Sequence, residues 1–564
     1  MTRRKSIFLF LILLVLVPFL LTRDNVSAEN DDPSQLWIFG SFQDAQNQPI
    51  EGVTISLLVI DSTEPISSTI SQSNGRFAIP VPLSLPDQLD LHINRHHFQE
   101  MNYTLDDIHI HKLQSGDSIA LSTIILNREI TLAFWLAGAV FVVVLILIAG
   151  GLLHNTLAAF AGASLLLAIS YLGNPISENL HIFSFSSAIS YIDWNVIFLI
   201  MGMMMVIAVV EETGIFHWLA YFAYRISGGR MWILLPVLMM ITGVASAFLD
   251  NVTTMLLMTP ITVQIALALN ISPLVLLIPE VFASNVIGVS TLIGTPTNIL
   301  IGSFGQITFN DFLINLTPGV FLAFIGLVAY SWFSYRKELA EANPSSQVLL
   351  EKLEERGKIT DPVNLRKAGW IGAGMMILFV FGETIHLLPS VTALIGASAL
   401  LIWIRPDVDD MIGAVDWTTL VFFMSLFIVV GSIQEVGLIS IIASKIGELI
   451  GGNLTLAMIV VTWFSAILSM VIANIPFTAA MLPVIAYLTQ LIPGADNNVL
   501  FYCLSIGAAM GGNGSLIGAS ANMITAGIAE RAGYRITYKY FLKKGLPALF
   551  ITVSLAMLWL FIRF

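Results

Sequence analysis

The chain has 564 residues, of which 56% are hydrophobic and only 11% are charged. Soluble domains carry about a quarter charged residues, so this composition excludes a water-soluble globular enzyme. The net charge of −12 comes without a long basic block, which excludes a nucleic-acid surface because nothing would neutralise a phosphate backbone. Apolar runs of about 20 residues, the length of a membrane-crossing helix, recur along the chain. They indicate a polytopic protein whose partner is the lipid bilayer.

The first 28 residues have the features of a targeting segment. A basic start is followed by an apolar stretch over 7–21 and by small residues at 26–28. This pattern is typical of a secretory signal peptide, and an uncleaved N-terminal anchor is the alternative. In both cases the segment that follows is exported.

Residues 29–128 are predicted to form an extracytoplasmic β-sandwich domain. Apolar and polar residues alternate with period two, as in 53–57 and 89–93, and turn-forming clusters separate these runs. Short strands at such spacing indicate a small sandwich. His109 and His111 stand two residues apart, as on an exposed strand.

Turn motifs in this domain resemble those of carboxypeptidase-regulatory-like sandwich domains. The resemblance is carried by the run 40–53 and by Asn-Gly-Arg-Phe at 74–77. It implies a fold rather than an activity.

From residue 129 onward the sequence is predicted to be helical and membrane-embedded. Two transporter-like stretches, 129–334 and 369–564, flank a polar segment over 335–368. That segment carries seven Lys and Arg residues, so the positive-inside rule places it in the cytoplasm as a linker.

The two stretches are copies of each other. Asp193-Trp194 recurs as Asp416-Trp417, an offset of 223 residues, and GVSTLIGTPTN at 288–298 recurs as GNGSLIGASAN at 512–522, an offset of 224. A single slowly drifting offset over more than a hundred residues indicates a gene duplication.

Charge gives the relative orientation of the copies. The loop 303–317 has no Lys or Arg, whereas its counterpart 531–544 has five. Homologous loops of opposite charge bias belong on opposite sides of the membrane, so the copies are predicted to be inverted repeats, a transporter architecture. Inversion requires an odd number of crossings, and we predict five in each repeat.

Each repeat is also predicted to contain a re-entrant hairpin and an interrupted helix. The hairpins span 231–270 and 453–492, with polar tips, and the helices interrupted by Gly or Pro follow them around 284–298 and 511–522. Unwound backbone at membrane depth is tolerated only where it is buried or lines a cavity. Carbonyls there can bind a cation, and half-helix N-termini attract an anion.

Asp250 and Glu280 are the acids placed deepest in apolar sequence. A buried carboxylate is costly unless it is paired, hydrated or protonated, so both are read as proton or cation sites. The alternatives are a helix cap for Asp250 and a structural pair for Glu280. The repeat counterparts are Ala473 and Leu504, so we expect the first repeat to handle the coupling ions.

Amides and hydroxyls at the tips and breaks complete the predicted site, although a lone Asn is more often a local backbone cap. The candidate transport and ion site comprises Asp250, Asn251, Thr253, Glu280, Ser284, Asn285, Thr295, Asn298, Asn474, Thr478, Asn513, Ser515, Ser520 and Asn522. Outside it, Glu211 and Glu212 are expected at a solvated helix end, 214–230 as an amphipathic interfacial arm, and the methionine cluster 201–205 on a lipid or packing surface.

Four segments resemble the ion transporter superfamily, with its citrate-transporter-like domain. Segments 211–230, 246–260, 283–302 and 513–534 are similar to the branch of arsenite permeases, sodium–proton antiporters and melanocyte P-proteins. The resemblance implies alternating access, with a hairpin-bearing part moving against a scaffold. The motif GTPTN at 294–298 is nearer the pattern of carboxylate carriers.

We therefore predict an all-α secondary active transporter of small ions, working by sodium–proton antiport or by inorganic anion (arsenite) efflux. A sodium- or proton-coupled citrate or dicarboxylate carrier is the alternative. A membrane-anchored sensor or adhesion protein acting through the β-domain is the alternative from another class. We expect no enzyme activity, no cofactor and no metal site, and leave open a bound sodium ion and a homodimer.

Overall fold

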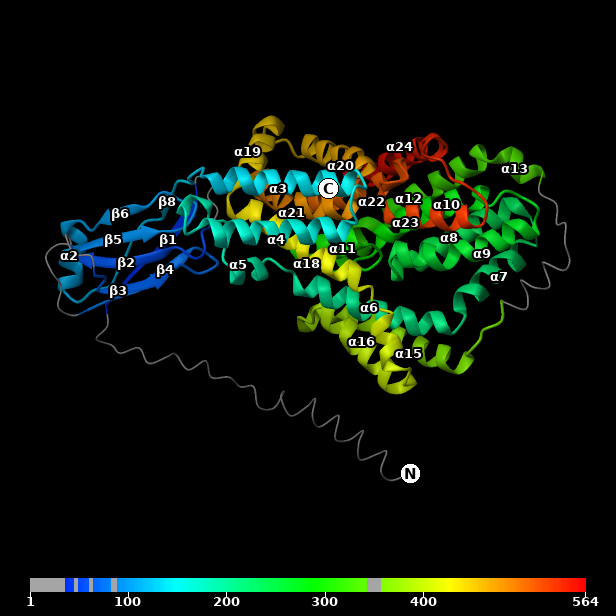
Figure 1. Ribbon diagram of the computed structural model, residues 1–564, viewed down its shortest axis with the longest axis horizontal. Helices are drawn as coiled ribbons and strands as arrows, with labels where there is room; N and C mark the ends of the chain where they lie inside the picture. Colours follow the sequence, from blue (N-terminus) through cyan, green and yellow to red (C-terminus); the bar gives the residue numbers. More distant parts are fainter. Residues whose placement is uncertain (1–35, 45–48, 60–63, 83–88, 229, 342–356) are drawn as a thin grey trace, which may run out of the picture. The chain divides into compact units, whose positions relative to one another are not determined.

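The computed structural model describes residues 36–44, 49–59, 64–82, 89–228, 230–341 and 357–564. The chain divides into two compact units, Met1–Glu129 and Ile130–Phe564 (Figure 1). The predicted signal segment 1–28 lies outside the described residues.

The first unit is built from two small sheets. In one, β1 pairs with β4, β7 and β8, and the other has the order β3-β2-β5-β6. The period-two alternation of the sequence is seen directly, because Ile55, Leu57, Leu91 and Ile93 all point into the core. The strands are β1 (Leu36–Asp44), β2 (Thr54–Val59), β3 (Ser67–Ile70), β4 (Arg76–Val81), β5 (Leu89–Asn94), β6 (Met101–Thr104), β7 (Ile119–Ala120) and β8 (Ile124–Leu126).

One segment of this unit differs from the prediction. Residues Asp107–Gln114 form helix α2, so the expectation that His109 and His111 lie on a strand is wrong. The Asp106 carboxylate accepts a hydrogen bond from the backbone N–H of His109 at 2.8 Å. Such a side-chain cap satisfies a free donor of the first turn and stabilises a short helix.

The second unit consists of two repeats with the same order of elements. The first contains α3 (Leu132–Ala149), α4 (Asn155–Gly173), α6 (Trp194–Glu212), α7 (Ile215–Ser227), α8 (Met231–Phe248), α9 (Asn251–Ala268), α10 (Leu274–Ile287), α11 (Pro296–Phe304) and α12 (Phe309–Ser334). The second contains α15 (Pro362–Phe381), α16 (Pro389–Ile404), α18 (Trp417–Glu435), α19 (Leu438–Ile450), α20 (Leu454–Val471), α21 (Asn474–Leu491), α22 (Val499–Gly511), α23 (Ser520–Arg531) and α24 (Tyr538–Arg563). Shorter elements are η1 (Glu178–Leu180), α5 (Phe185–Ser190), η2 (Gly288–Ser290), α13 (Arg336–Glu341), η3 (Gly382–Ile385), α17 (Val408–Gly413) and η4 (Gly512–Gly514).

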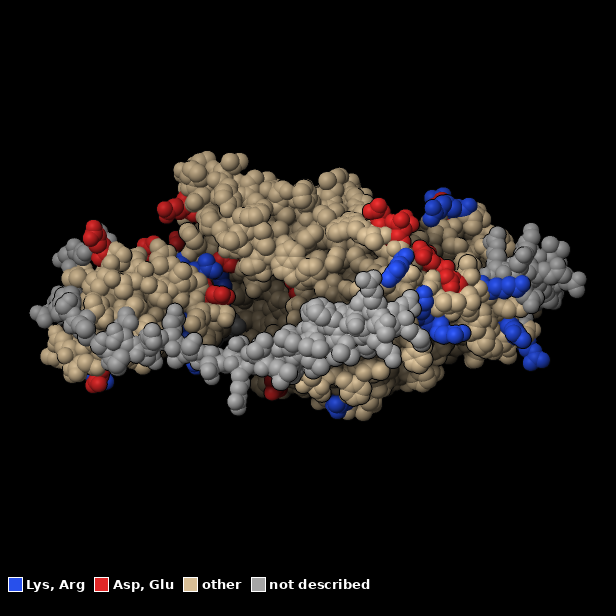
Figure 2. Space-filling model, turned by 90° about the horizontal axis from the view of Figure 1, so that it is seen from below, with Lys and Arg blue, Asp and Glu red and all other residues tan. Residues whose placement is uncertain are grey.

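The protein is an integral multi-pass membrane protein. Among the described residues, 11 helices are long and apolar enough to cross a bilayer, counting the hairpin arms α8, α9, α20 and α21. One face of the helical unit shows a broad band without charged side chains (Figure 2). An uncharged helical surface of this kind is what a lipid environment requires.

The interrupted helices appear as the sequence predicts. In the first repeat α10 ends in the 3₁₀ turn η2 before α11 begins, and in the second α22 ends in η4 before α23. The helices α7 and α19 occupy equivalent places in the two repeats. Each begins after a glycine in the left-handed region, Gly214 with φ 78° and Gly437 with φ 84°, a conformation that glycine adopts at little cost.

Candidate functional site

The first turns of four helices line a single cavity of about 660 Å³, here called the Asp250 cavity. Val252 and Thr253 belong to the start of α9, Pro296 to α11, Ile475 to α21 and Ser520 to α23. The two hairpin tips and the two helix breaks therefore come together. Helix N-termini carry a partial positive charge and free N–H groups, so these first turns favour negatively charged groups.

A hydroxyl fixes each break loop to the hairpin of its own repeat. Thr291 Oγ1 donates to the carbonyl of Ala247 and accepts from the N–H of Gly294 at 3.1 Å. Ser515 Oγ makes the same pair of bonds in the second repeat, with the carbonyl of Met470 and the N–H of Gly518. The predicted site residue Ser515 is thus part of the loop's scaffold.

One glycine in each break loop lets that loop pack directly against backbone atoms. A Cβ at Gly294 would lie 2.4 Å from the carbonyl oxygen of Gly288 and 2.8 Å from that of Ser246. A Cβ at Gly518 would lie 2.9 Å from the carbonyl oxygen of Ser469. Backbone atoms cannot move aside as a side-chain end can, so no larger residue fits here.

One asparagine in each repeat holds the break loop of its own repeat. Asn298 Nδ2 donates to the carbonyl oxygens of Val289 at 3.0 Å and Thr291 at 2.8 Å. Asn522 Nδ2 donates to the carbonyl oxygens of Gly512 and Ser515, both at 2.8 Å. These amides hold unwound backbone whose polar groups would otherwise be unsatisfied in a buried position.

The same asparagines connect the repeats. Ser505 Oγ on α22 donates to Asn298 Oδ1 at 2.6 Å. Asn285 Nδ2 on α10 donates to Asn522 Oδ1 at 3.1 Å and to Asn513 Oδ1 at 2.9 Å. Asn251 at the hairpin tip joins them, because its Nδ2 donates to Asn285 Oδ1 at 2.8 Å. The structure therefore brings five of the predicted asparagines into buried contacts that span both repeats.

Asp250 caps α9 and also faces the cavity. Its Oδ1 accepts from the N–H groups of Val252 and Thr253, both at 2.9 Å, and its Oδ2 accepts from Thr253 Oγ1 at 2.5 Å. Thr295 Oγ1 caps α11 by accepting from the N–H of Asn298 at 3.2 Å. The helix-cap alternative for Asp250 is therefore present in the geometry, together with its place in the cavity wall.

The equivalent positions of the second repeat have no side-chain acceptor. Ala473 precedes α21 and Ala519 precedes α23. The first turns of α21 and α23 therefore have no side-chain cap from the preceding residue. Ile475 and Ser520, which belong to these turns, line the same cavity.

Glu280 lies apart from this cavity. Its side chain is fully buried on α10, where Thr262 Oγ1 donates to Oε1 at 3.1 Å. The other oxygen, Oε2, has no hydrogen-bond partner among the described residues. An acid in this position is costly to keep charged.

The remaining predicted residues have local roles. Ser284 Oγ donates to Ser246 Oγ at 3.0 Å, which joins α10 to α8. Thr478 Oγ1 donates to the carbonyl oxygen of Asn474 at 2.7 Å, within its own helix, and Asn474 is buried at the start of α21.

Sequence reasoning missed part of the cavity wall. Glu211 and Asp416 contribute two further carboxylates, and Met203 and Met204 line the cavity although a lipid or packing surface was expected for the methionine cluster. Among the described residues that line the cavity, none is Lys or Arg. The wall is therefore acidic, a feature that the positions of single residues in the sequence did not reveal.

The comparisons with known proteins agree with this architecture. A family model described as "Citrate transporter" (CitMHS) matches residues 142–501. An uncharacterized transporter of Mycobacterium bovis is 35% identical over 429 residues, which cover 76% of this chain and 98% of that protein. The human P protein is 31% identical over 507 residues, covering 76% of this chain and 59% of that protein. The crystal structure of the YdaH transporter of Alcanivorax borkumensis has a similar fold, with a TM-score of 0.50 and 14% identity over 73% of this chain and 98% of that one.

Proposed function

We propose that this chain, which belongs to the citrate transporter family, is a cation-coupled secondary active transporter whose transport site is the Asp250 cavity. Membership of this family makes the protein a membrane transporter of a small solute. The coupling ion, the residues that bind it and alternating access are the parts that we propose.

The acidic wall of the cavity is the observation that carries this proposal. Three carboxylates, those of Glu211, Asp250 and Asp416, line it, and among the described residues no Lys or Arg neutralises them there. Asp250 lies at a hairpin tip, and intramembrane carboxylates that face a cavity typically carry protons or cations, whereas Glu211 and Asp416 lie at exposed helix ends and add negative charge to the wall. The wall combines these carboxylates with the partial positive charge of four helix N-termini. Two of those N-termini are already capped by Asp250 and Thr295, so the side-chain charge of the wall favours a cation such as sodium or a proton.

Asp250 is the group that we propose to alternate between proton and cation. Two of its oxygen lone pairs are used by N–H groups and one by the Thr253 hydroxyl. A carboxylate offers about four such sites, so acceptor capacity remains toward the cavity. Because one carboxylate cannot hold a proton and a sodium ion together, binding of one releases the other, which is the basis of exchange.

A second candidate is a carboxylate carrier coupled to a cation. It is favoured by the starts of α21 and α23, whose preceding residues are alanines and whose first turns line the cavity. Uncapped helix N-termini bind carboxylates through N–H groups and the helix dipole. In this case the substrate would occupy the second-repeat side of the cavity and the cation the Asp250 side.

Purified protein in liposomes with an internal pH-sensitive dye separates the two candidates. An imposed proton gradient is challenged in turn with sodium, lithium, arsenite, citrate and succinate, for wild type and for Asp250→Asn. A proton flux triggered by sodium or lithium that Asp250→Asn abolishes supports the antiporter. A proton flux triggered only by a carboxylate supports a proton-coupled carrier, and uptake of radiolabelled citrate or succinate driven by a sodium gradient supports a sodium-coupled one.

The matched control is Asp193→Asn. Asp193 caps α6 by accepting from the N–H groups of Asn195 at 3.0 Å and Val196 at 3.3 Å, and it does not belong to the Asp250 cavity wall. Flux should persist in this variant. Silence with every solute, in folded protein of known orientation, contradicts the proposed function.

A further inference from the structure

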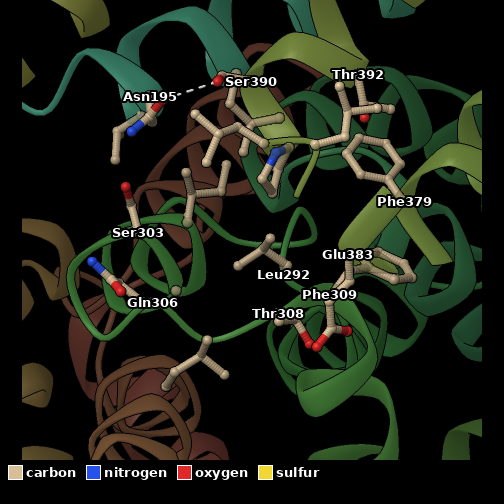
Figure 3. Close-up of a pocket in the computed structure, with 18 of the residues that line it drawn as sticks. Asn195, Leu292, Ser303, Gln306, Thr308, Phe309, Phe379, Glu383, Ser390 and Thr392 are labelled. Atoms are coloured by element: carbon tan, nitrogen blue, oxygen red, sulfur yellow. Dashed lines mark hydrogen bonds between the residues drawn. The ribbon is translucent and has the colours of Figure 1, made fainter. Parts of the chain in front are cut away.

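A second cavity lies near the other end of helix α6. It has a volume of about 380 Å³ and is here called the Asn195 cavity. Its wall combines Asn195 and Ser303 with the aromatic rings of Phe309 and Phe379 and the carboxylate of Glu383 (Figure 3). Asn195 Oδ1 accepts from Ser390 Oγ at 3.1 Å, which joins α6 to α16 at the rim of this cavity.

One face of α6 lines both cavities. The residues of this face that line the Asn195 cavity are Asn195, Val196 and Leu199, and those that line the Asp250 cavity are Ile200, Met203, Met204, Ile207, Ala208 and Glu211. Steps of three and four residues keep side chains on one side of a helix. These residues therefore form one continuous stripe along α6. The change from one cavity to the other falls between Leu199 and Ile200.

The first interrupted helix shows the same change of cavity. Leu292 lines the Asn195 cavity and Ile293 the Asp250 cavity, while Ile299 on α11 lines both. Together with Leu199 and Ile200, these residues form an apolar layer that we call the septum. All five side chains are buried, with exposed fractions between 2% and 6%.

Close packing holds the septum in place on the side of the interrupted helix. A Cβ at Gly302 would lie 2.0 Å from Leu292 Cδ1, so a side chain at this position would displace the end of Leu292 from its place against α11. Gly302 itself lines the Asn195 cavity. The septum thus combines branched side chains from two elements, α6 and the interrupted helix.

We propose that the two cavities are the two halves of one transport pathway along this face of α6, and that the septum is the barrier that closes it in this conformation. This inference rests on the proposed transport function. A narrow constriction lined only by branched apolar side chains excludes water and ions. The Asn195 cavity then receives or releases the solute on the opposite side of the membrane from the Asp250 cavity, with Glu383 as a cation-attracting group in its wall.

Single-cysteine labelling tests the geometry without requiring transport. The native Cys503 is buried, so Cys503→Ala gives a background free of thiols. Ser303→Cys and Ala208→Cys then report on the Asn195 and Asp250 cavities in vesicles of known orientation, with a membrane-impermeant maleimide added on one side at a time. We expect each cysteine to react from one side only, and the two from opposite sides. Reaction of both from the same side overturns the inference, even if transport is found.

A leak measurement tests the barrier itself. Ile299→Ala thins the septum, whereas Ile301→Ala removes an equally buried isoleucine of α11 that lines neither of these cavities. In liposomes without substrate we expect Ile299→Ala to raise passive sodium or proton leak about threefold or more, because a hydrophobic barrier weakens steeply when it widens. If Ile299→Ala leaks no more than Ile301→Ala, the septum is not the barrier and this part of the inference is wrong. If wild-type flux is absent but the labelling pattern holds, the proposed coupling fails and the pathway stands.

Discussion

The hairpin tip of the first repeat and that of the second differ in one chemical respect. Asp250 precedes α9 and caps it, whereas Ala473 stands at the same place before α21. The same contrast recurs at the breaks, where Thr295 caps α11 and Ala519 precedes α23. At the hairpin tips and the helix breaks, therefore, the capping carboxylate and the capping hydroxyl belong to the first copy.

The parts that hold the breaks together are the same in both copies. Thr291 and Ser515 make equivalent bonds to the hairpins, and Gly294 and Gly518 make equivalent backbone contacts. Asn298 and Asn522 each bind two carbonyls of their own break loop, and one of the two, that of Thr291 or Ser515, is at the equivalent position. Duplication thus supplied a symmetric frame for unwound backbone, and the asymmetry lies in the groups that face the cavity. The predictions below test this division between frame and function.

The largest effect is expected when the first tip is made like the second. Asp250→Ala should lower sodium-triggered proton flux about 100-fold or more, because it removes the only tip carboxylate. The loss of the helix cap by itself costs about 1 kcal/mol, so the protein should remain folded in detergent. Asp193→Ala removes a cap of the same kind outside the Asp250 cavity wall, since the N–H groups of Asn195 and Val196 donate to Asp193 at 3.0 and 3.3 Å. Equal loss of flux in both variants would mean that capping, not charge at the tip, matters.

The glycine contacts should affect both repeats alike. Gly294→Ala and Gly518→Ala are each expected to destabilise the protein by about 3 kcal/mol, because a Cβ would overlap backbone atoms that cannot relax. Thermal unfolding in detergent measures this. Gly527→Ala on α23 is the control, since nothing lies within 4 Å of its Cβ position and alanine is favoured in a helix. A Gly518→Ala variant as stable as this control would show that the symmetric frame is absent.

The bridging asparagines come next in size. Asn298→Ala and Asn522→Ala should each cost about 2–4 kcal/mol, because two buried carbonyls lose their donor. The same thermal measurement applies. Asn298→Asp keeps the oxygen that accepts from Ser505 but removes the donors, so it should be no more stable than Asn298→Ala. A large loss in one repeat and none in the other would break the equivalence.

The smallest effect is expected at the hydroxyls that fix the loops. Thr291→Ala and Ser515→Ala should cost about 1–2 kcal/mol each, the value of a lost buried hydrogen bond. Thr291→Ser and Ser515→Thr exchange the two native residues and keep the hydroxyl, so their unfolding temperatures should stay close to that of wild type. If these exchanges destabilise the protein as much as the alanine substitutions do, the loss of stability comes from packing of the methyl group and not from the hydrogen bond.

Much of the fold was predictable because duplication leaves a record in the sequence. The offset between Asp193 and Asp416, and the repeated glycine-rich breaks, gave the order of elements and the membrane character. The residue pairs inside the site were not predictable. Asn298 pairs with Ser505, and Asn522 with Asn285, yet Ser505 and Asn285 do not occupy equivalent repeat positions. Which face of a helix meets its neighbour depends on its rotation, and a pattern of polar positions does not determine that rotation.

Two other features show why predictions from short sequence segments were incomplete. His109 and His111 have strand spacing, but the Asp106 cap stabilises a helix there. Glu211 was expected at a solvated helix end, and it is exposed, but the cavity that it lines is formed by tips and breaks distant in sequence. A cavity wall is a property of packing between elements, so a single helix does not reveal it.

The most direct test of the account is the exchange of a proton for a cation at Asp250. Sodium chloride is added to purified protein in weakly buffered detergent solution, and the released protons are measured for wild type, Asp250→Asn and Asp193→Asn. The account predicts sodium-dependent proton release in wild type and Asp193→Asn and none in Asp250→Asn, because the amide does not exchange a proton for a cation. Undiminished release from Asp250→Asn would contradict it.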